Sequence, residues 1–269
     1  MQIVDAHTHL RTGKLSGTPT PASAELALQL LQEDMEQAEL TTSLVVTWPE
    51  DVPVLASEAV HSPGRVYSLL WFDSRSPDRS LQELVLLVER FPAVLIGVKT
   101  VFPYLYQSPL QREFFPLYAF CQERRLPIQF HFGGNPRMEA VCHPSLFAVL
   151  ARTFQQLSII CLHAGGGWRQ EIPHLLATCP NVYLEVEGLQ LHEAQLNLPP
   201  QVLPYLLQHC RSEKIMFGSD RLGREEKFFR RVQFIRSLPP PYREDLCYRT
   251  AANVYRLQEE KRKDSRPLF

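Results

Sequence analysis

Short apolar runs alternate with longer amphipathic segments along the whole chain. The short runs are rich in β-branched residues and are bounded by turn-forming residues, a pattern that is typical of buried strands. The predicted strands are Gln2–Asp5, Ser43–Thr47, Val66–Trp71, Val94–Lys99, Ile128–Phe132, Ser158–His163, Val182–Val186 and Ile215–Gly218.

The longer segments have a helical period. In Ser80–Phe91, apolar residues fall at Leu81, Leu84, Val85 and Val88, which places them on one face of a helix. The helical period is weakest in Val54–His61. The predicted helices are Ala24–Glu39, Val54–His61, Ser80–Phe91, Gln111–Arg125, Pro144–Gln156, Glu171–Thr178, Gln201–Arg211, Glu225–Ser237 and a last one from Tyr242 to Leu257.

Strands that alternate with helices indicate βαβ units and a parallel sheet, which is the α/β class. Eight such units in a chain of 269 residues match the size of a closed (β/α)8 TIM barrel. An open, doubly wound sheet has the same periodicity and stays an alternative. The sequence has no internal repeat, low-complexity tract or linker, so residues 1–269 are expected to form a single domain.

Charge and cysteine content limit the partners. The net charge of −1 and the pI of about 6.8 give no electrostatic reason to expect nucleic acid or a membrane surface. Six dispersed cysteines without a secretion signal or a long apolar span favour free thiols and a cytoplasmic protein. We expect a small-molecule substrate, with a carboxylated one as an option, and a homo-oligomer is left open.

Nearly every predicted strand ends in a residue that can bind a metal ion or carry a proton. Strand ends in a barrel meet at one mouth, where barrel enzymes do their chemistry. The residues at these ends are His7, His9, Lys99, His131, His163, Glu185, Glu187 and Asp220.

The His7-x-His9 pair predicts chelation, because side chains two residues apart on a strand point the same way. Each residue also has an ordinary interpretation when it is taken alone. The two histidines could bond to solvent, His131 and His163 could be core histidines, and Asp220 could cap a helix. Taken together, the five residues favour a divalent ion, most simply Zn²⁺, with Fe²⁺, Mn²⁺ and Co²⁺ as alternatives. Three glycines after His163 predict a tight turn that brings backbone close to a ligand or metal.

These motifs resemble the amidohydrolase superfamily, in particular its amidohydrolase-2 branch, the aminocarboxymuconate-semialdehyde-decarboxylase-like proteins. The resemblance covers nearly the whole chain in order. It rests on Asp5-Ala-His-Thr-His9, Gly97-Val-Lys99, Phe130-His131-Phe132, Leu162-His163-Ala-Gly-Gly166, Phe217-Gly-Ser-Asp220 and Ala252-Asn253-Val-Tyr-Arg-Leu257.

The resemblance implies a (β/α)8 barrel in which His7, His9, His131 and Asp220 hold one metal ion. In single-metal members the histidine that matches His163 stays off the ion and acts on its water. In two-metal members a carboxylated lysine, here Lys99, bridges the ions, and His163 binds the second. One ion is favoured, because the simpler interpretation of Lys99 is an unmodified ammonium. Such an ammonium would pair with Glu185, Glu187 or a substrate carboxylate.

The activity that the resemblance implies is metal-assisted attack of water on a C–N or C–O bond of a small carbonyl compound, with Asp220 moving the proton and His163 assisting. The branch also contains non-oxidative decarboxylases, hydratases and lactonases, so decarboxylation of a small unsaturated or aromatic acid is the alternative. A third hypothesis is a barrel that binds metal without catalysis. The presence of all the candidate metal ligands, together with a proton-carrying Asp and His, argues against it.

Four residues on loops after the strands are candidate substrate contacts. Arg137 follows the fifth strand, Trp168 and Arg169 follow the sixth, and Tyr104 follows the fourth. Arginine suits planar recognition of carboxylates, and the aromatic side chains suit a ring. All four could equally be ordinary loop residues.

Overall fold

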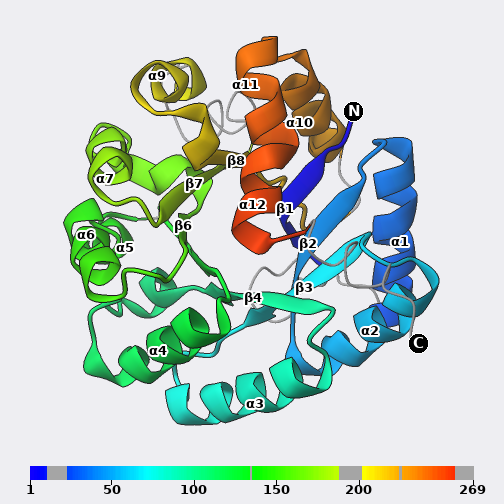
Figure 1. Ribbon diagram of the computed structural model, residues 1–269, viewed down its shortest axis with the longest axis horizontal. Helices are drawn as coiled ribbons and strands as arrows, with labels where there is room; N and C mark the ends of the chain where they lie inside the picture. The colour runs from blue at the N-terminus through cyan, green and yellow to red at the C-terminus, as the bar shows by residue number, and fades with distance from the viewer. Residues whose placement is uncertain (11–22, 134, 188–201, 224–225, 258–269) are drawn as a thin grey trace, which may run out of the picture.

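The computed structural model describes residues 1–10, 23–133, 135–187, 202–223 and 226–257. Eight parallel strands follow one another around a single sheet in the order β1 to β8, and Figure 1 shows helices around its outside. This is the predicted (β/α)8 barrel, and the open sheet is excluded. The strands are β1 (Val4–His9), β2 (Thr42–Thr47), β3 (Val66–Trp71), β4 (Leu95–Thr100), β5 (Ile128–Phe130), β6 (Ile159–Cys161), β7 (Val182–Val186) and β8 (Ile215–Phe217).

Each predicted helix is present, with its ends shifted by a few residues. The largest shift is at the fourth, where a 3-10 turn at Arg112–Phe114 precedes the α-helix. The helices are α1 (Ala24–Gln37), α2 (Val52–His61), α3 (Pro77–Arg90), α4 (Phe115–Arg124), α6 (Pro144–Thr153), α7 (Ile172–Thr178), α9 (Val202–His209), α10 (Glu226–Ser237), α11 (Pro240–Glu244) and α12 (Thr250–Tyr255).

Two features differ from the prediction. The sequence did not indicate α5 (Pro136–Val141), a short helix whose N-terminus Asn135 caps with its side chain. The last helix is not uniform, because a π-helical segment, Asp245–Arg249, joins α11 to α12. None of the helices in the described ranges is long and apolar enough to cross a bilayer. The six cysteines are all free, as predicted.

The hydrophobic core has two parts. The larger lies between the strands and the surrounding helices, and the smaller fills the inside of the barrel. The inner part combines residues from several strands with Tyr255 of α12, whose hydroxyl accepts a hydrogen bond from Gln129 (2.9 Å). This apolar plug leaves the polar strand ends above it as the mouth. Its members on β1, β2 and β3 include Val4, Ala6, Leu44 and Leu69.

A β-bulge in β1 decides which way the two histidines face. Asp5 pairs with Ser43 and Thr8 with Val45, so β1 holds one residue more than β2 over this stretch. Val4 and Ala6 lie inside the barrel, and strict alternation would then direct His7 outward. The inserted residue reverses the alternation, so that His7 and His9 turn to the interior. The predicted strand, Gln2–Asp5, was therefore too short, because the histidines belong to β1 itself.

A substitution at Gly97 on β4 would test how tightly the barrel interior is packed. A Cβ atom at this position would lie 2.8 Å from Leu69 Cδ2 and 3.0 Å from the carbonyl oxygen of Pro127. We expect Gly97→Ala to lower the free energy of unfolding by about 1–3 kcal/mol, because the core must shift to admit the methyl group. Urea denaturation measures this. Gly223→Ala is the matched control, since no atom lies within 4 Å of its Cβ position; equal losses in the two variants would contradict the interpretation.

Candidate metal centre

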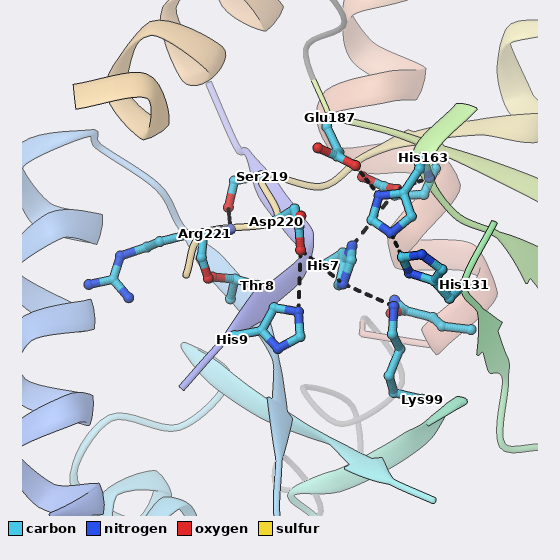
Figure 2. Close-up of polar contacts among 12 residues, drawn as sticks. His7, Thr8, His9, Lys99, His131, His163, Glu187, Ser219, Asp220 and Arg221 are labelled. Atoms are coloured by element: carbon cyan, nitrogen blue, oxygen red, sulfur yellow. Dashed lines mark hydrogen bonds and ion pairs between the residues drawn. The ribbon is translucent and has the colours of Figure 1, made fainter. Parts of the chain in front are cut away.

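The seam that closes the barrel carries three of the predicted metal ligands. The Asp220 amide donates to the carbonyl oxygen of His7 (2.8 Å), and the His9 amide donates to that of Arg221 (3.0 Å). These bonds join β1 to the segment after β8, and the His7, His9 and Asp220 side chains converge, as Figure 2 shows. Asp220 Oδ1 lies 3.2 Å from His9 Nε2 and 3.6 Å from His7 Nε2.

This spacing fits a bound ion. A tetrahedral ion with bonds of about 2.0–2.1 Å keeps its ligand atoms roughly 3.3 Å apart, which is close to both distances. Among the described residues, His7, His9 and Asp220 form one of three overlapping groups that could hold a metal ion. The others are His7 with His163 and Glu185, and His163 with Glu187 and Asp220.

The protonation states also suit a metal. Burial, together with the charge of Lys99, lowers the pKa of His7 well below its ordinary value, so its ring is neutral and keeps a lone pair. Burial alone would raise the pKa of Asp220, but the His9 hydrogen bond and the neighbouring imidazoles outweigh it and lower that pKa well below its usual range. A neutral imidazole and an ionised carboxylate are the forms that bind metal ions.

His131, the fourth predicted ligand, lies in a chain of hydrogen bonds with His163 and Glu187. His163 Nδ1 contacts Glu187 Oε1, and His163 Nε2 lies 2.9 Å from His131 Nδ1, as Figure 2 shows. Burial alone would raise the pKa of Glu187, but the adjacent His163 and Arg231 outweigh it and lower that pKa, so this carboxylate accepts hydrogen bonds. The tautomer of His163 that donates from Nδ1 to Glu187 accepts from His131 on Nε2. That order leaves His131 Nε2 unprotonated, which is the form that a metal ligand needs.

Lys99 reaches the same centre from β4. Its Nζ lies 3.2 Å from His7 Nε2, and the side chain is almost fully buried. Burial lowers the pKa of this ammonium to about 8, although the charges of Asp220, Glu185 and Glu187 oppose the change. The structure thus brings Lys99 to the ligand cluster, as predicted. Its contact is with an imidazole rather than with the carboxylates expected from the sequence.

The two glutamates at the end of β7 differ in their environments. Burial, and the negative charge of Glu187 beside it, raise the pKa of Glu185 well above its usual value, so Glu185 is protonated. Glu187 is ionised and pairs with Arg231 of α10 (3.2 Å) as well as with His163. Arg231 also donates to the carbonyl oxygen of Ser219, and thereby links β7 to the residue before Asp220.

Buried polar contacts hold Asp220 in an unusual backbone conformation. Its φ of 47° lies in the left-handed region, which is unfavourable for a residue with a side chain. On one side, Ser219 donates to Asp5 through its amide (2.7 Å) and hydroxyl (2.6 Å). On the other, Arg221 points away from the imidazoles and donates to Asp34 of α1 at 2.8 and 2.6 Å (Figure 2 shows Arg221).

Sequence reasoning missed these supporting residues. Asp34 and Arg231 lie on helices whose sequences have an ordinary amphipathic pattern, and Arg221 lies in the segment after a strand. The available signal was a charged residue on an apolar helix face. Asp34 is flanked by buried Leu31 and Met35, and a charge there requires a partner.

The glycines after His163 serve a different contact from the one predicted. A Cβ on Gly166 would lie 2.6 Å from the amide nitrogen of Gly133, and Gly166 has a φ of 60°. The close backbone approach that the structure shows is therefore between the segments that follow β5 and β6, and a ligand or metal at this turn stays a prediction. The turn keeps His163 beside His131.

The candidate substrate contacts divide into two groups. The Tyr104 ring lies 4.8 Å from the His131 ring and is 54% exposed, so it belongs to the mouth. Trp168 donates from Nε1 to the carbonyl oxygen of Glu139 (2.9 Å) and packs against the main core. Arg137 lies in α5 and is exposed, and Arg169 is half-buried beside Glu139. Of these four residues, only Tyr104 contacts a predicted metal ligand.

With the fold and the site described, the chain can be compared with known proteins. The family model described as Amidohydrolase matches residues 4–257. The chain belongs to this family. None of the curated proteins matches it. The family assignment confirms the resemblance found in the sequence.

Solved structures share this amidohydrolase fold at low sequence identity. The uncharacterized TIM-barrel protein Bb4693 from Bordetella bronchiseptica is 20% identical, covers 96% of this chain and 99% of its own, and has a TM-score of 0.71. The 5-carboxyvanillate decarboxylase LigW from Sphingomonas paucimobilis is 14% identical (95% and 99% covered, TM-score 0.65). A dihydroxybenzoic acid decarboxylase from Polaromonas sp. JS666, with bound manganese and the inhibitor 2-nitroresorcinol, is 12% identical (95% and 97% covered, TM-score 0.67).

The ligand assignment can be tested by removing two imidazoles at once. We expect His7→Ala/His9→Ala to lose its divalent metal, because a catalytic site with half of its protein ligands retains little affinity. Elemental analysis after dialysis measures the metal bound per chain. His174→Ala is the control, since His174 is exposed on α7. Full occupancy in the double variant would refute the assignment.

The burial of Lys99 predicts a pH dependence of stability in the metal-free protein. The folded pKa of about 8 lies below the ordinary lysine pKa of 10.5, so between these pH values the unfolded chain binds more protons. The free energy of unfolding should therefore rise from pH 8 to 10.5, by about 3 kcal/mol at most. Urea denaturation of the wild type against Lys99→Met isolates this contribution. Parallel pH profiles for the two proteins would contradict it.

Proposed function

We propose that this amidohydrolase is a metal-dependent, non-oxidative decarboxylase of a small unsaturated or aromatic carboxylic acid. The observation that carries the proposal is Lys99, a buried cation whose Nζ lies 3.2 Å from His7 Nε2. A lysine in the wall of a metal site, without a carboxylate in hydrogen-bond contact in the described structure, suits an anionic substrate group.

The charge balance of the site supports an anionic substrate. Two ionised carboxylates, Asp220 and Glu187, face two cations, Lys99 and Arg231, while Glu185 is protonated. The side chains are therefore close to neutral as a group, and a divalent ion would make the site positive. A carboxylate would restore neutrality when it binds.

The fold neighbours support the same reaction. Two of them are named as decarboxylases of aromatic acids, and one carries manganese. For this chain we propose one divalent ion held by His7, His9, His131 and Asp220. The nitrogen and carboxylate donors suit Zn²⁺, with Mn²⁺ as the alternative. This proposal departs from the hydrolysis that we first expected, since the neighbours favour the alternative.

Different residues of the site would have different roles in such a reaction. A bound divalent ion would supply positive charge to hold the substrate's oxygen atoms. Loss of carbon dioxide breaks the C–C bond to the carboxylate and leaves its electron pair on carbon, which must take up one proton. Asp220, 22% exposed at the mouth, is placed to take a proton from water and deliver it to that carbon, which leaves hydroxide to combine with the carbon dioxide as bicarbonate. His163, oriented by Glu187, assists by hydrogen bonding.

The proposal is tested with metal-reconstituted protein and two acids, 5-carboxyvanillate and 2,6-dihydroxybenzoate. Release of carbon dioxide, without incorporation of ¹⁸O from labelled water into the organic product, is the expected result. Asp220→Asn should lower the rate by at least about 100-fold, which is the scale of general acid–base catalysis. Circular dichroism of that variant checks that the fold persists.

Two outcomes would overturn the proposal. Label from water in the organic product would return the assignment to hydrolysis. A rate within twofold of the wild type in Asp220→Asn would remove the role of Asp220, whatever the substrate.

A further inference from the structure

Two tryptophans stand at the ends of β2 and β3, on the part of the barrel rim between His9 and Lys99. Trp48 directly follows β2, and Trp71 is the last residue of β3. Their ring centroids are 4.9 Å apart at an interplanar angle of 36°. They form one continuous aromatic surface, which we call the tryptophan pair.

The tryptophan pair faces the inside of the barrel. Leu44 on β2 and Leu69 on β3 lie in the inner hydrophobic cluster. Trp71 is two residues beyond Leu69, so strand alternation directs it to the same side. Trp48 is four residues beyond Leu44, and its own backbone is still extended, with φ −82° and ψ 161°. Both indoles therefore stand above the apolar plug, at the level of the mouth.

The pair is also next to the charged part of the site. Trp71 is the register partner of Lys99 on β4. Neighbouring strands are about 4.8 Å apart, so the indole of Trp71 and the Lys99 side chain rise from adjacent positions on the same side of the sheet. On the other side, β2 pairs with β1, the strand that carries His7 and His9. An apolar wall thus adjoins a cation and the metal ligands.

The indoles are only partly covered. Trp48 and Trp71 are both half-buried, and within the described residues neither belongs to a hydrophobic cluster nor packs against one. The third tryptophan, Trp168, packs against the main core and has a hydrogen-bond partner for its ring nitrogen. Within the described residues, the pair therefore has no core-packing role of the kind that Trp168 has.

We propose that the tryptophan pair is the subsite for the planar, conjugated part of the substrate, whose carboxylate points to Lys99 and the metal ligands. This inference rests on the proposed function and narrows its substrate to flat, conjugated acids. Indole faces bind planar rings by offset or tilted stacking and bind saturated rings less well. The pair thus selects for shape, and the neighbouring charges select for the carboxylate.

The test compares two acids of similar size and equal charge, benzoate and cyclohexanecarboxylate. Equilibrium binding to the metal-loaded protein is measured by calorimetry, which needs no turnover. The wild type should prefer benzoate by about three- to tenfold, the scale of an aromatic contact. Trp48→Leu and Trp71→Leu should each reduce that preference, and the double variant should remove it, with little change for cyclohexanecarboxylate.

The matched controls are Trp48→Phe and Trp71→Phe, which keep a ring and should keep most of the preference. A wild type that binds both acids equally would overturn the inference. So would a Leu double variant that loses affinity for both acids in the same proportion, because that result means general damage to the rim.

The subsite and the reaction can fail separately. A preference for benzoate without release of carbon dioxide from any acid would support the subsite and refute the proposed decarboxylation. Release of carbon dioxide from the wild type, without a preference that depends on Trp48 and Trp71, would leave the reaction standing and refute the subsite.

Discussion

The structure depends above all on the seam between β1 and the end of β8. Two backbone hydrogen bonds there, from Asp220 to His7 and from His9 to Arg221, close the barrel. The same bonds set three candidate metal ligands at the spacing that a bound ion would need. The contacts that close the sheet therefore also assemble the candidate metal centre. A chain with an open seam would lack both the last strand contact and the convergence of imidazoles and carboxylate.

Buried charge around the seam is arranged in pairs, each with a structural reason. Asp34 binds Arg221, Glu187 binds His163 and Arg231, and Asp5 accepts from Ser219. These contacts hold Asp220 at a positive φ and give His163 a single orientation. Breaking a buried pair strands a charge in a medium of low polarity, so the network resists rearrangement. The catalytic proposal draws on this rigidity, because a proton carrier must keep its distance from the substrate.

The mouth has two chemically distinct parts. Histidines and carboxylates from β1, β7 and the segments after β5, β6 and β8 form the polar part, with Lys99 at its border. The tryptophan pair and Tyr104 supply aromatic surface beside it. A flat acid could satisfy both parts at once, with its charge toward the cations and its ring against the indoles. The proposed decarboxylation of a conjugated acid would use both parts of the mouth.

Hydrophobic periodicity was sufficient to predict eight alternating strand–helix units, because strand and helix periods are local properties, but the same periodicity also fits an open sheet. Local order along each strand likewise placed His7, His9, His131, His163 and Asp220 at one mouth. Other features depend on contacts between distant segments. The bulge that turns His7 inward exists only relative to β2, and the partners of Asp34 and Arg231 lie far away in sequence. The orientation of the imidazoles and the pairing of Trp48 with Trp71 were decided by tertiary structure, since side-chain direction and burial arise only when the sheet closes.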